Sequence, residues 1–160
     1  MSAQQQFEKM PIKEQFKSIQ IIHIALMIGL ILIFTVLWFS NPIVVNMNPL
    51  DGTFALILPF VMFTAIVGGM ALYNSRKKIT FQEGNIKAKL WEYRRTSLLR
   101  WSLIEGASLA CIIVFYFVES NISILFAFTL GLFAFSISRP TVDGFATDYQ
   151  LNQQERNQLQ

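Results

Sequence analysis

The chain has 160 residues, of which 53% are hydrophobic and only 14% are charged. A soluble domain has roughly 25% charged residues, so this composition excludes an ordinary soluble globular domain and indicates a protein that sits in lipid. The formal net charge is +3, but the basic residues lie next to apolar runs, which is typical of membrane topology signals rather than of nucleic-acid binding. We therefore expect a single all-α membrane domain and no nucleic-acid partner.

The first part of the chain combines a polar start with a long apolar run. Residues 1–18 are polar and Gln-rich, and Ile12, Phe16 and Ile19 follow at helical spacing. This pattern predicts a cytoplasmic amphipathic segment that lies at the lipid headgroups. Residues 19–39 are long enough for a first membrane span, which needs about 20 apolar residues. No small-residue cleavage pattern follows the run, so we expect it to be retained rather than removed as a signal peptide.

Two further spans are predicted, and a basic connector separates them. Residues 40–52 hold two prolines and a glycine and are expected to form a loop. The second span is predicted at residues 53–73, with Pro59 near its start, where a missing N–H group is tolerated. Residues 74–97 form the basic connector. From about Ile86 no Gly or Pro interrupts the sequence before the third span at residues 98–118, which predicts one long helix extending from the membrane into the cytoplasm.

The last part of the chain contains a short span and a polar tail. A tight turn at residues 119–121 precedes the fourth predicted span, at residues 122–138. Its apolar part, residues 122–137, would measure roughly 24 Å at a rise of 1.5 Å per residue. The span therefore either extends by a turn or thins the bilayer locally. Residues 141–160 are predicted to be a polar cytoplasmic tail, which either holds a loose helix after Thr147 or is disordered.

The distribution of charge predicts the orientation of the spans. All 13 Lys and Arg residues lie before the first span, from the end of the second span to Arg100 in the first turn of the third, or at and after the end of the fourth. The two opposite loops carry only Asp51 and Glu119. The positive-inside rule therefore places both termini and the basic connector in the cytoplasm of a multi-pass protein of the bacterial inner membrane.

An internal repeat is indicated when spans one and two are aligned with spans three and four. Small residues four apart fall on one another in this alignment, which predicts two tandem helical hairpins of the same orientation. Coincidence between apolar runs is the alternative explanation. Small residues let helix backbones approach closely in lipid, and the third span carries the longest stripe of them, so we expect it to be the centre of packing. The candidate packing residues are Ala25, Gly29, Thr64, Gly68, Ser102, Gly106, Ala110, Ala127 and Gly131.

The candidate polar site consists of Glu105, His23 and Arg100. Glu105 is the one acidic residue inside an apolar run, and an unpaired charge at that level costs on the order of 2–3 kcal/mol. His23 is expected at a similar depth on the first span, so we expect Glu105 either to pair with His23 or to be protonated. Arg100 either joins them or extends to the headgroups, and Arg76 and Arg139 are further candidate partners. One hypothesis is a proton or ion site. The favoured hypothesis is a polar contact that fixes helix register.

Other chemistry has little support in the sequence. Cys111 lies inside an apolar run and is expected to be a small core residue. One His and one Cys at different depths do not make a metal site, and no nucleophile has His/Asp company, so we expect no metal, no cofactor, no catalytic residue and no enzyme activity. The basic residues of the connector predict contact with anionic lipid headgroups.

One segment of the third span carries a resemblance to known proteins. The pattern Lys89-Leu90…Tyr93-Arg94…Leu99-Arg100-Trp101…Leu103-Ile104-Glu105-Gly106 resembles an uncharacterised family of small bacterial four-span inner-membrane proteins. The resemblance covers most of the chain and brings no activity with it. Leu103-Ile104-Glu105-Gly106-Ala107 is also similar to the membrane carboxylate segment of rotary-ATPase proteolipid subunits. The chain departs from that pattern because its other helices lack dense glycine repeats and its connector is long and basic, so we do not expect the proteolipid role.

These observations lead to one main functional prediction and one alternative. We expect an integral inner-membrane protein that acts as a non-enzymatic scaffold or accessory subunit of a membrane assembly and associates through its small-residue faces. Its partners would be the lipid bilayer together with copies of itself or other membrane proteins. The alternative is a small transporter or proton-coupled subunit that uses Glu105 with His23.

Overall fold

The computed structural model describes residues 10–40, 43–80 and 85–159, without the side chains of residues 78–80. In these ranges all regular structure is helical apart from one isolated bridge between Asn46 and Asn121. The helices are α2 (Ile12–Ser40), α3 (Phe54–Thr80), α4 (Ile86–Phe117), α5 (Ile122–Ile137), α6 (Val142–Asp148) and α7 (Gln153–Asn157). The all-α prediction is therefore confirmed for the described part of the chain.

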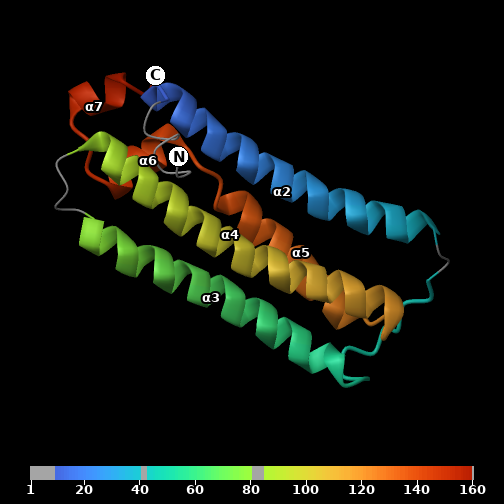
Figure 1. Ribbon diagram of the computed structural model, residues 1–160. Coiled ribbons are helices and arrows are strands. Elements are labelled where there is room, and N and C mark those ends of the chain that lie inside the picture. Colours follow the sequence, from blue (N-terminus) through green and yellow to red (C-terminus); the bar gives the residue numbers. More distant parts are fainter. Residues whose placement is uncertain (1–9, 41–42, 81–84, 160) are drawn as a thin grey trace, which may run out of the picture.

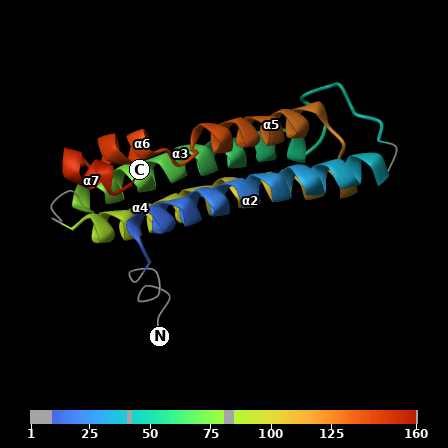
Figure 2. The ribbon, with the colours of Figure 1, turned by 90° about the horizontal axis from the view of Figure 1, so that it is seen from above.

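The four long helices run side by side, each antiparallel to the next in sequence (Figures 1 and 2). α4 packs against α2, α3 and α5, as expected for the third span. α2 and α3 are not among the helix pairs in extensive contact, and α4 lies between them in Figure 1. The first two long helices thus do not pack as a hairpin, because each of them uses α4 rather than the other as its main neighbour.

Within the described ranges, three helices are long and apolar enough to cross a membrane. They are Ile12–Ser40, Phe54–Lys77 and Ile86–Phe117. α5 qualifies only together with α6, and this pair is bent by 79°. The sequence prediction of a membrane protein is consistent with these lengths, whereas the fourth span depends on whether the bent pair is counted as one.

Side-chain caps explain where the later helices begin. The side chain of Asn85 accepts a hydrogen bond from the backbone N–H of Lys87 at 3.0 Å. This cap makes α4 begin at Ile86, as the sequence predicts. Asn121 caps α5 in the same way through Ser123, at 2.8 Å. Because α4 then continues without a break to Phe117, the prediction of one long third helix is confirmed.

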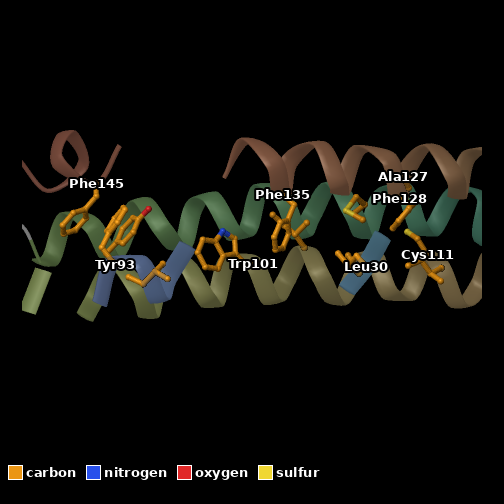
Figure 3. Close-up of a cluster of buried hydrophobic side chains, with 14 of the residues drawn as sticks. Leu30, Tyr93, Trp101, Cys111, Ala127, Phe128, Phe135 and Phe145 are labelled. Atoms are coloured by element: carbon orange, nitrogen blue, oxygen red, sulfur yellow. The ribbon is translucent and has the colours of Figure 1, made fainter. Parts of the chain in front are cut away.

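A continuous apolar core follows α4 along its length (Figure 3). Trp101 and Ile104 lie in its middle, and Cys111 and Phe115 lie further along the helix; all four are at most 2% exposed. Cys111 is therefore a core residue, as expected. Gly131 of α5 approaches this part of α4 so closely that an added Cβ would lie 2.8 Å from the Ser108 hydroxyl oxygen.

The C-terminal tail is folded and packs against the bundle, which corrects the prediction of a loose tail. Phe145 of α6 is fully buried, and Tyr149 is 1% exposed. The ring of Phe145 lies 4.9 Å from that of Tyr93 and 6.1 Å from that of Phe16, measured between centroids. Burying a phenylalanine stabilises a fold by about 1.5–3 kcal/mol, which offsets part of what the ordering of a polar segment costs. Burial also raises the pKa of Tyr149 to about 12, so its phenol stays protonated at neutral pH.

The start of α2 belongs to the same cluster. From residue 12 onwards, the predicted amphipathic segment belongs to the same helix as the first predicted span, because α2 runs unbroken from Ile12 to Ser40. Phe16 and Ile19 are at most 3% exposed, since they face α4 and α6. The part of that prediction before residue 10 lies outside the described residues. We call the end of the bundle that holds this cluster the basic end, because Lys77, Lys89, Arg94, Arg100 and Arg139 lie there.

At the opposite end, the two loops are joined by hydrogen bonds. The backbone N–H of Asn46 donates to Ser120 at 2.8 Å, and that of Ile122 donates to Asn46 at 3.0 Å. The amide of the fully buried Asn121 donates to the carbonyls of Asn48 and Asp51, at 2.9 and 2.6 Å. These bonds fix α3 and α5 to each other at this end.

Candidate functional site

The predicted pair of His23 and Glu105 is not formed. His23 is 2% exposed, and its Nε2 lies 3.0 Å from the carbonyl oxygen of Phe135 on α5. Its ring is held between the rings of Trp101 and Phe135, with both centroid distances at 4.8 Å. The bundle brings α5 against this part of α2, which sequence reasoning could not foresee. His23 therefore fixes the end of α5 instead of pairing with a carboxylate.

Glu105 lies half-buried at the edge of the outward face of α4, which is the side of the helix that carries the exposed Ser102. At 3.6 residues per turn it falls between the exposed Ser102 and the buried Trp101 on the helix circumference. No hydrogen bond or ion pair connects its carboxylate to another residue that the structure describes. Its partner is therefore not supplied by the described part of this chain.

Arg100 is turned away from Glu105 and towards α3. Its guanidinium lies 5.8 Å from the centre of the Tyr73 ring, and the start of its side chain packs on Gly69, where an added Cβ would lie 3.1 Å from Arg100 Cγ. Its Nε is buried and has no hydrogen-bond acceptor in the described structure. The three predicted site residues are thus directed to three different places. His23 contacts α5, Glu105 lies at the outward face of α4, and Arg100 faces α3.

The break between α5 and α6 is held by side chains from two other helices. The last carbonyls of a helix lack partners within it. Here Phe135 accepts from His23, Ser138 accepts from Trp101 Nε1 at 3.3 Å, and Pro140 accepts from Gln20 Nε2 at 3.2 Å. Pro140 marks the break in the sequence. The roles of Gln20 and Trp101 were not predicted, because a polar atom near the end of a span also suits the headgroups.

A polar cavity of about 190 Å³ lies beside this break, between α3, α4, the end of α5 and α6. Its walls include Ser97 and Arg100 from α4, Arg139 and Thr141 from the break, and Asp148 from α6. These residues are spread over about a third of the sequence, and their proximity depends on the tail folding back. No sequence pattern predicted this cavity.

Asp148 is already paired within the protein. Its carboxylate accepts from the Tyr73 hydroxyl at 2.6 Å and from Lys77 Nζ at 2.5 Å. Lys77 and Asp148 are both 30% exposed, so the pair is partly screened by solvent. A second ion pair, between Lys89 and Glu155 at 3.3 Å, holds α7 to the start of α4. The tail thus neutralises basic residues that sequence analysis assigned to lipid headgroups.

A larger cavity of about 670 Å³ lies on the other side of the break, between α2 and the α5–α6 pair. It is lined by the apolar side chains of Ile24 and Met27 and by polar groups such as His23. Arg139 and Thr141 line both cavities. The break therefore places a guanidinium between a polar space and a more apolar one.

The predicted packing residues fall into two classes. On α5, Ala127 is fully buried, and a Cβ added at Gly131 would lie 2.6 Å from Met62 Cε. In contrast, Gly29, Gly68 and Gly106 have no heavy atom within 4 Å of an added Cβ. The remaining predicted residues on α2, α3 and α4 are exposed or half-buried: Ala25, Thr64, Ser102 and Ala110. Within the chain, the prediction therefore holds for α5 and is wrong for the three glycines of α2, α3 and α4.

Comparison with known proteins finds no match to this chain among family models, curated proteins or solved structures. Within the described residues, no three His, Cys, Asp or Glu side chains lie together in a way that could hold a metal ion. The site must therefore be interpreted from its geometry alone. That geometry offers an outward face with small residues and a polar break with two cavities.

Proposed function

We propose that the protein is a non-enzymatic scaffold or accessory subunit of the bacterial inner membrane, which binds another membrane helix through one face of the bundle. We call the side of α2, α3 and α4 that is turned away from α5 the open face; it contains Gly29, Gly68 and Gly106. The observation that carries the proposal is that these three glycines have open space where a side chain would be. Small residues are useful where another backbone approaches, and the described part of this chain supplies none there.

Helical geometry supports placing the three glycines on one face. Nine residues are two and a half turns, so residues nine apart lie on opposite sides of a helix. Gly29 is nine residues after Gln20, which bonds to Pro140 just after α5. Gly68 is nine residues after Pro59, which shares a cavity with residues of α5.

The same geometry supports placing Gly106 on the open face. On α4, Arg100 contacts α3 and Trp101 contacts α2, while Ser108 meets Gly131 of α5. Because successive residues are turned by about 100°, Gly106 lies on the remaining side of α4, opposite Ser108. All three glycines are thus turned away from α5.

Glu105 gives this face a chemical reason to bind a partner. It lies at the edge of the open face, and its carboxylate has no partner among the described residues. An ionised carboxylate in lipid costs on the order of 2–3 kcal/mol. A hydrogen-bond donor on a second membrane helix would lower that cost, which makes the association specific as well as close-packed.

We further propose four spans with both ends of the chain in the cytoplasm, with the bent α5–α6 pair as the fourth. The support is that Lys77, Lys89 and Arg139 lie at one end of the bundle, whereas the acidic residues Asp51 and Glu119 lie at the opposite end. The test uses single cysteines at the exposed positions Met47 and Asn74, with buried Cys111 as the background. An impermeant thiol reagent added outside spheroplasts should label Met47→Cys and not Asn74→Cys. The reverse pattern would overturn the orientation.

Association is tested by native mass in lipid nanodiscs. The full chain should have a mass above the 18.3 kDa of one copy, either as a multiple of it or with a second protein. Thr64→Leu and Thr129→Leu form a matched pair, because both threonines are exposed and bond only to a carbonyl of their own helix. Thr64→Leu alters α3 beside the open face and should reduce the mass to one copy, whereas Thr129→Leu, on α5, should not. A mass of one copy for the unaltered chain, or equal effects of the two variants, would contradict the proposal.

A further inference from the structure

The polar cavity beside the α5–α6 break has an excess of positive charge. Arg100 and Arg139 both line it, and neither forms an ion pair with a carboxylate in the described part of the chain. The carboxylate that lines it, that of Asp148, is already neutralised by Lys77 and bonded to Tyr73. Two guanidinium groups therefore share this cavity with one carboxylate, whose charge Lys77 already balances.

Arg100 in particular offers a buried hydrogen-bond donor to a ligand that accepts hydrogen bonds. The Nε of Arg100 is buried with no acceptor, although a buried donor without a partner costs free energy. The side chain cannot relax freely, because it packs on Gly69 and over the Tyr73 ring. The hydroxyl of Thr141 accepts from the backbone N–H of Gly144 at 3.1 Å and keeps its own proton for donation.

We propose that this cavity binds a phosphate group, with Arg100 and Arg139 as its charged ligands and Thr141 as a hydroxyl donor. The planar guanidinium presents paired N–H donors that match phosphate oxygens. The cavity of about 190 Å³ offers the space of roughly six water molecules, at about 30 Å³ each, which is enough for a tetrahedral oxyanion. This site is separate from the open face and does not depend on association with another helix.

Two sources supply the same chemistry: the headgroup of an anionic phospholipid and free inorganic phosphate. The neighbouring cavity of about 670 Å³ shares Arg139 and Thr141 and adds the apolar side chains of Ile24 and Met27. An acyl chain fits that space, whereas free phosphate makes no use of it. Met27→Trp, which narrows the larger cavity with a bulkier side chain, therefore distinguishes the two sources.

The experiment uses the full chain with two probes. The first probe is phosphatidylglycerol, counted by native mass spectrometry after reconstitution in mixed phosphatidylglycerol and phosphatidylcholine nanodiscs. The second is sodium phosphate, titrated against thermal unfolding in detergent with sodium chloride at equal ionic strength. Arg100→Gln and Arg139→Gln are compared with Arg95→Gln, an exposed arginine on α4 that lines neither cavity. Arg139 is itself exposed, so its substitution keeps the fold even where Arg100→Gln does not.

We expect at least one probe to bind, and its affinity to fall about tenfold in Arg139→Gln and in a folded Arg100→Gln, as for the loss of one charge-assisted hydrogen bond. Arg95→Gln should bind as the unaltered chain does. If Met27→Trp no longer binds phosphatidylglycerol but still binds phosphate, the ligand is the lipid. If phosphate is the one probe that binds, and Met27→Trp binds it as the unaltered chain does, the ligand is the free anion. The proposal is overturned if neither probe binds, or if Arg95→Gln weakens binding as much as Arg139→Gln.

Discussion

Gly131 and Gly106 stand in the same kind of sequence pattern and have opposite surroundings. An added Cβ at Gly131 would lie within 3 Å of Met62 and Ser108, while at Gly106 it would meet nothing within 4 Å. Both residues are four positions after another small residue on an apolar helix. The comparison teaches that such spacing indicates where a backbone can approach, but not which neighbour approaches or whether it belongs to the same chain.

The largest expected effect is that of Gly131→Leu. The new side chain would overlap Met62 and Ser108 at the contact between α3, α4 and α5, and we expect a loss of about 3 kcal/mol of unfolding free energy or a failure to fold. Unfolding of purified protein by denaturant in detergent measures the effect. Gly106→Leu is the matched control and should change monomer stability by less than about 0.5 kcal/mol. Equal destabilisation by the two variants would remove the distinction between the two surfaces.

A second test compares His23, which faces α5, with Glu105, at the edge of the open face. His23→Ala removes the contact with the Phe135 carbonyl and the ring contacts with Trp101 and Phe135, so we expect a loss of about 2 kcal/mol. Glu105→Ala breaks no contact seen in the described structure and should destabilise the monomer by no more than about 0.5 kcal/mol. A stability loss for Glu105→Ala as large as that for His23→Ala would show a hidden contact within the chain.

The smallest expected effect is that of Glu105→Gln. Glutamine keeps hydrogen-bonding atoms at this position, so the mass of the assembly in nanodiscs should be unchanged, whereas Glu105→Leu should weaken association. Proton flux into proteoliposomes should be the same for Glu105→Gln and for the unaltered chain. Loss of such a flux in Glu105→Gln, with folding and association intact, would favour the proton-coupled alternative over the scaffold proposal.

The positions of the long helices were largely predictable, because hydrophobic length and capping act locally. Asn85 and the absence of Gly or Pro after it specify the start of α4 from the sequence alone. The tail was predictable only in part. The buried positions of Phe145 and Tyr149 depend on partners far away in sequence, and a segment of mixed polarity gives no periodic signal strong enough to indicate them.

The candidate site was identified by residue type but not by arrangement. Intramembrane cost singled out His23, Glu105 and Arg100 as residues that need a role. The similar depths of His23 and Glu105 along their helices suggested that the two side chains meet. Whether they meet also depends on how each helix is rotated about its own axis, and the packing of the neighbouring helices sets that rotation. The cavity around Arg100 needed Arg139 and Asp148 from the other end of the chain, and no spacing rule connects them.

The sequence by itself determined that the chain is helical, apolar enough to cross a membrane, and basic at one end. Each of these properties depends on local composition, on helix length or on the sum of charges. The tertiary structure alone decided that α2 and α3 pack on α4 rather than on each other, that Gly131 is packed while Gly106 is open, and that Arg100 faces a polar cavity. The physical reason is that all the long helices offer apolar surface on every side, so the helices' mutual packing, rather than a pattern on any one of them, selects which face is buried.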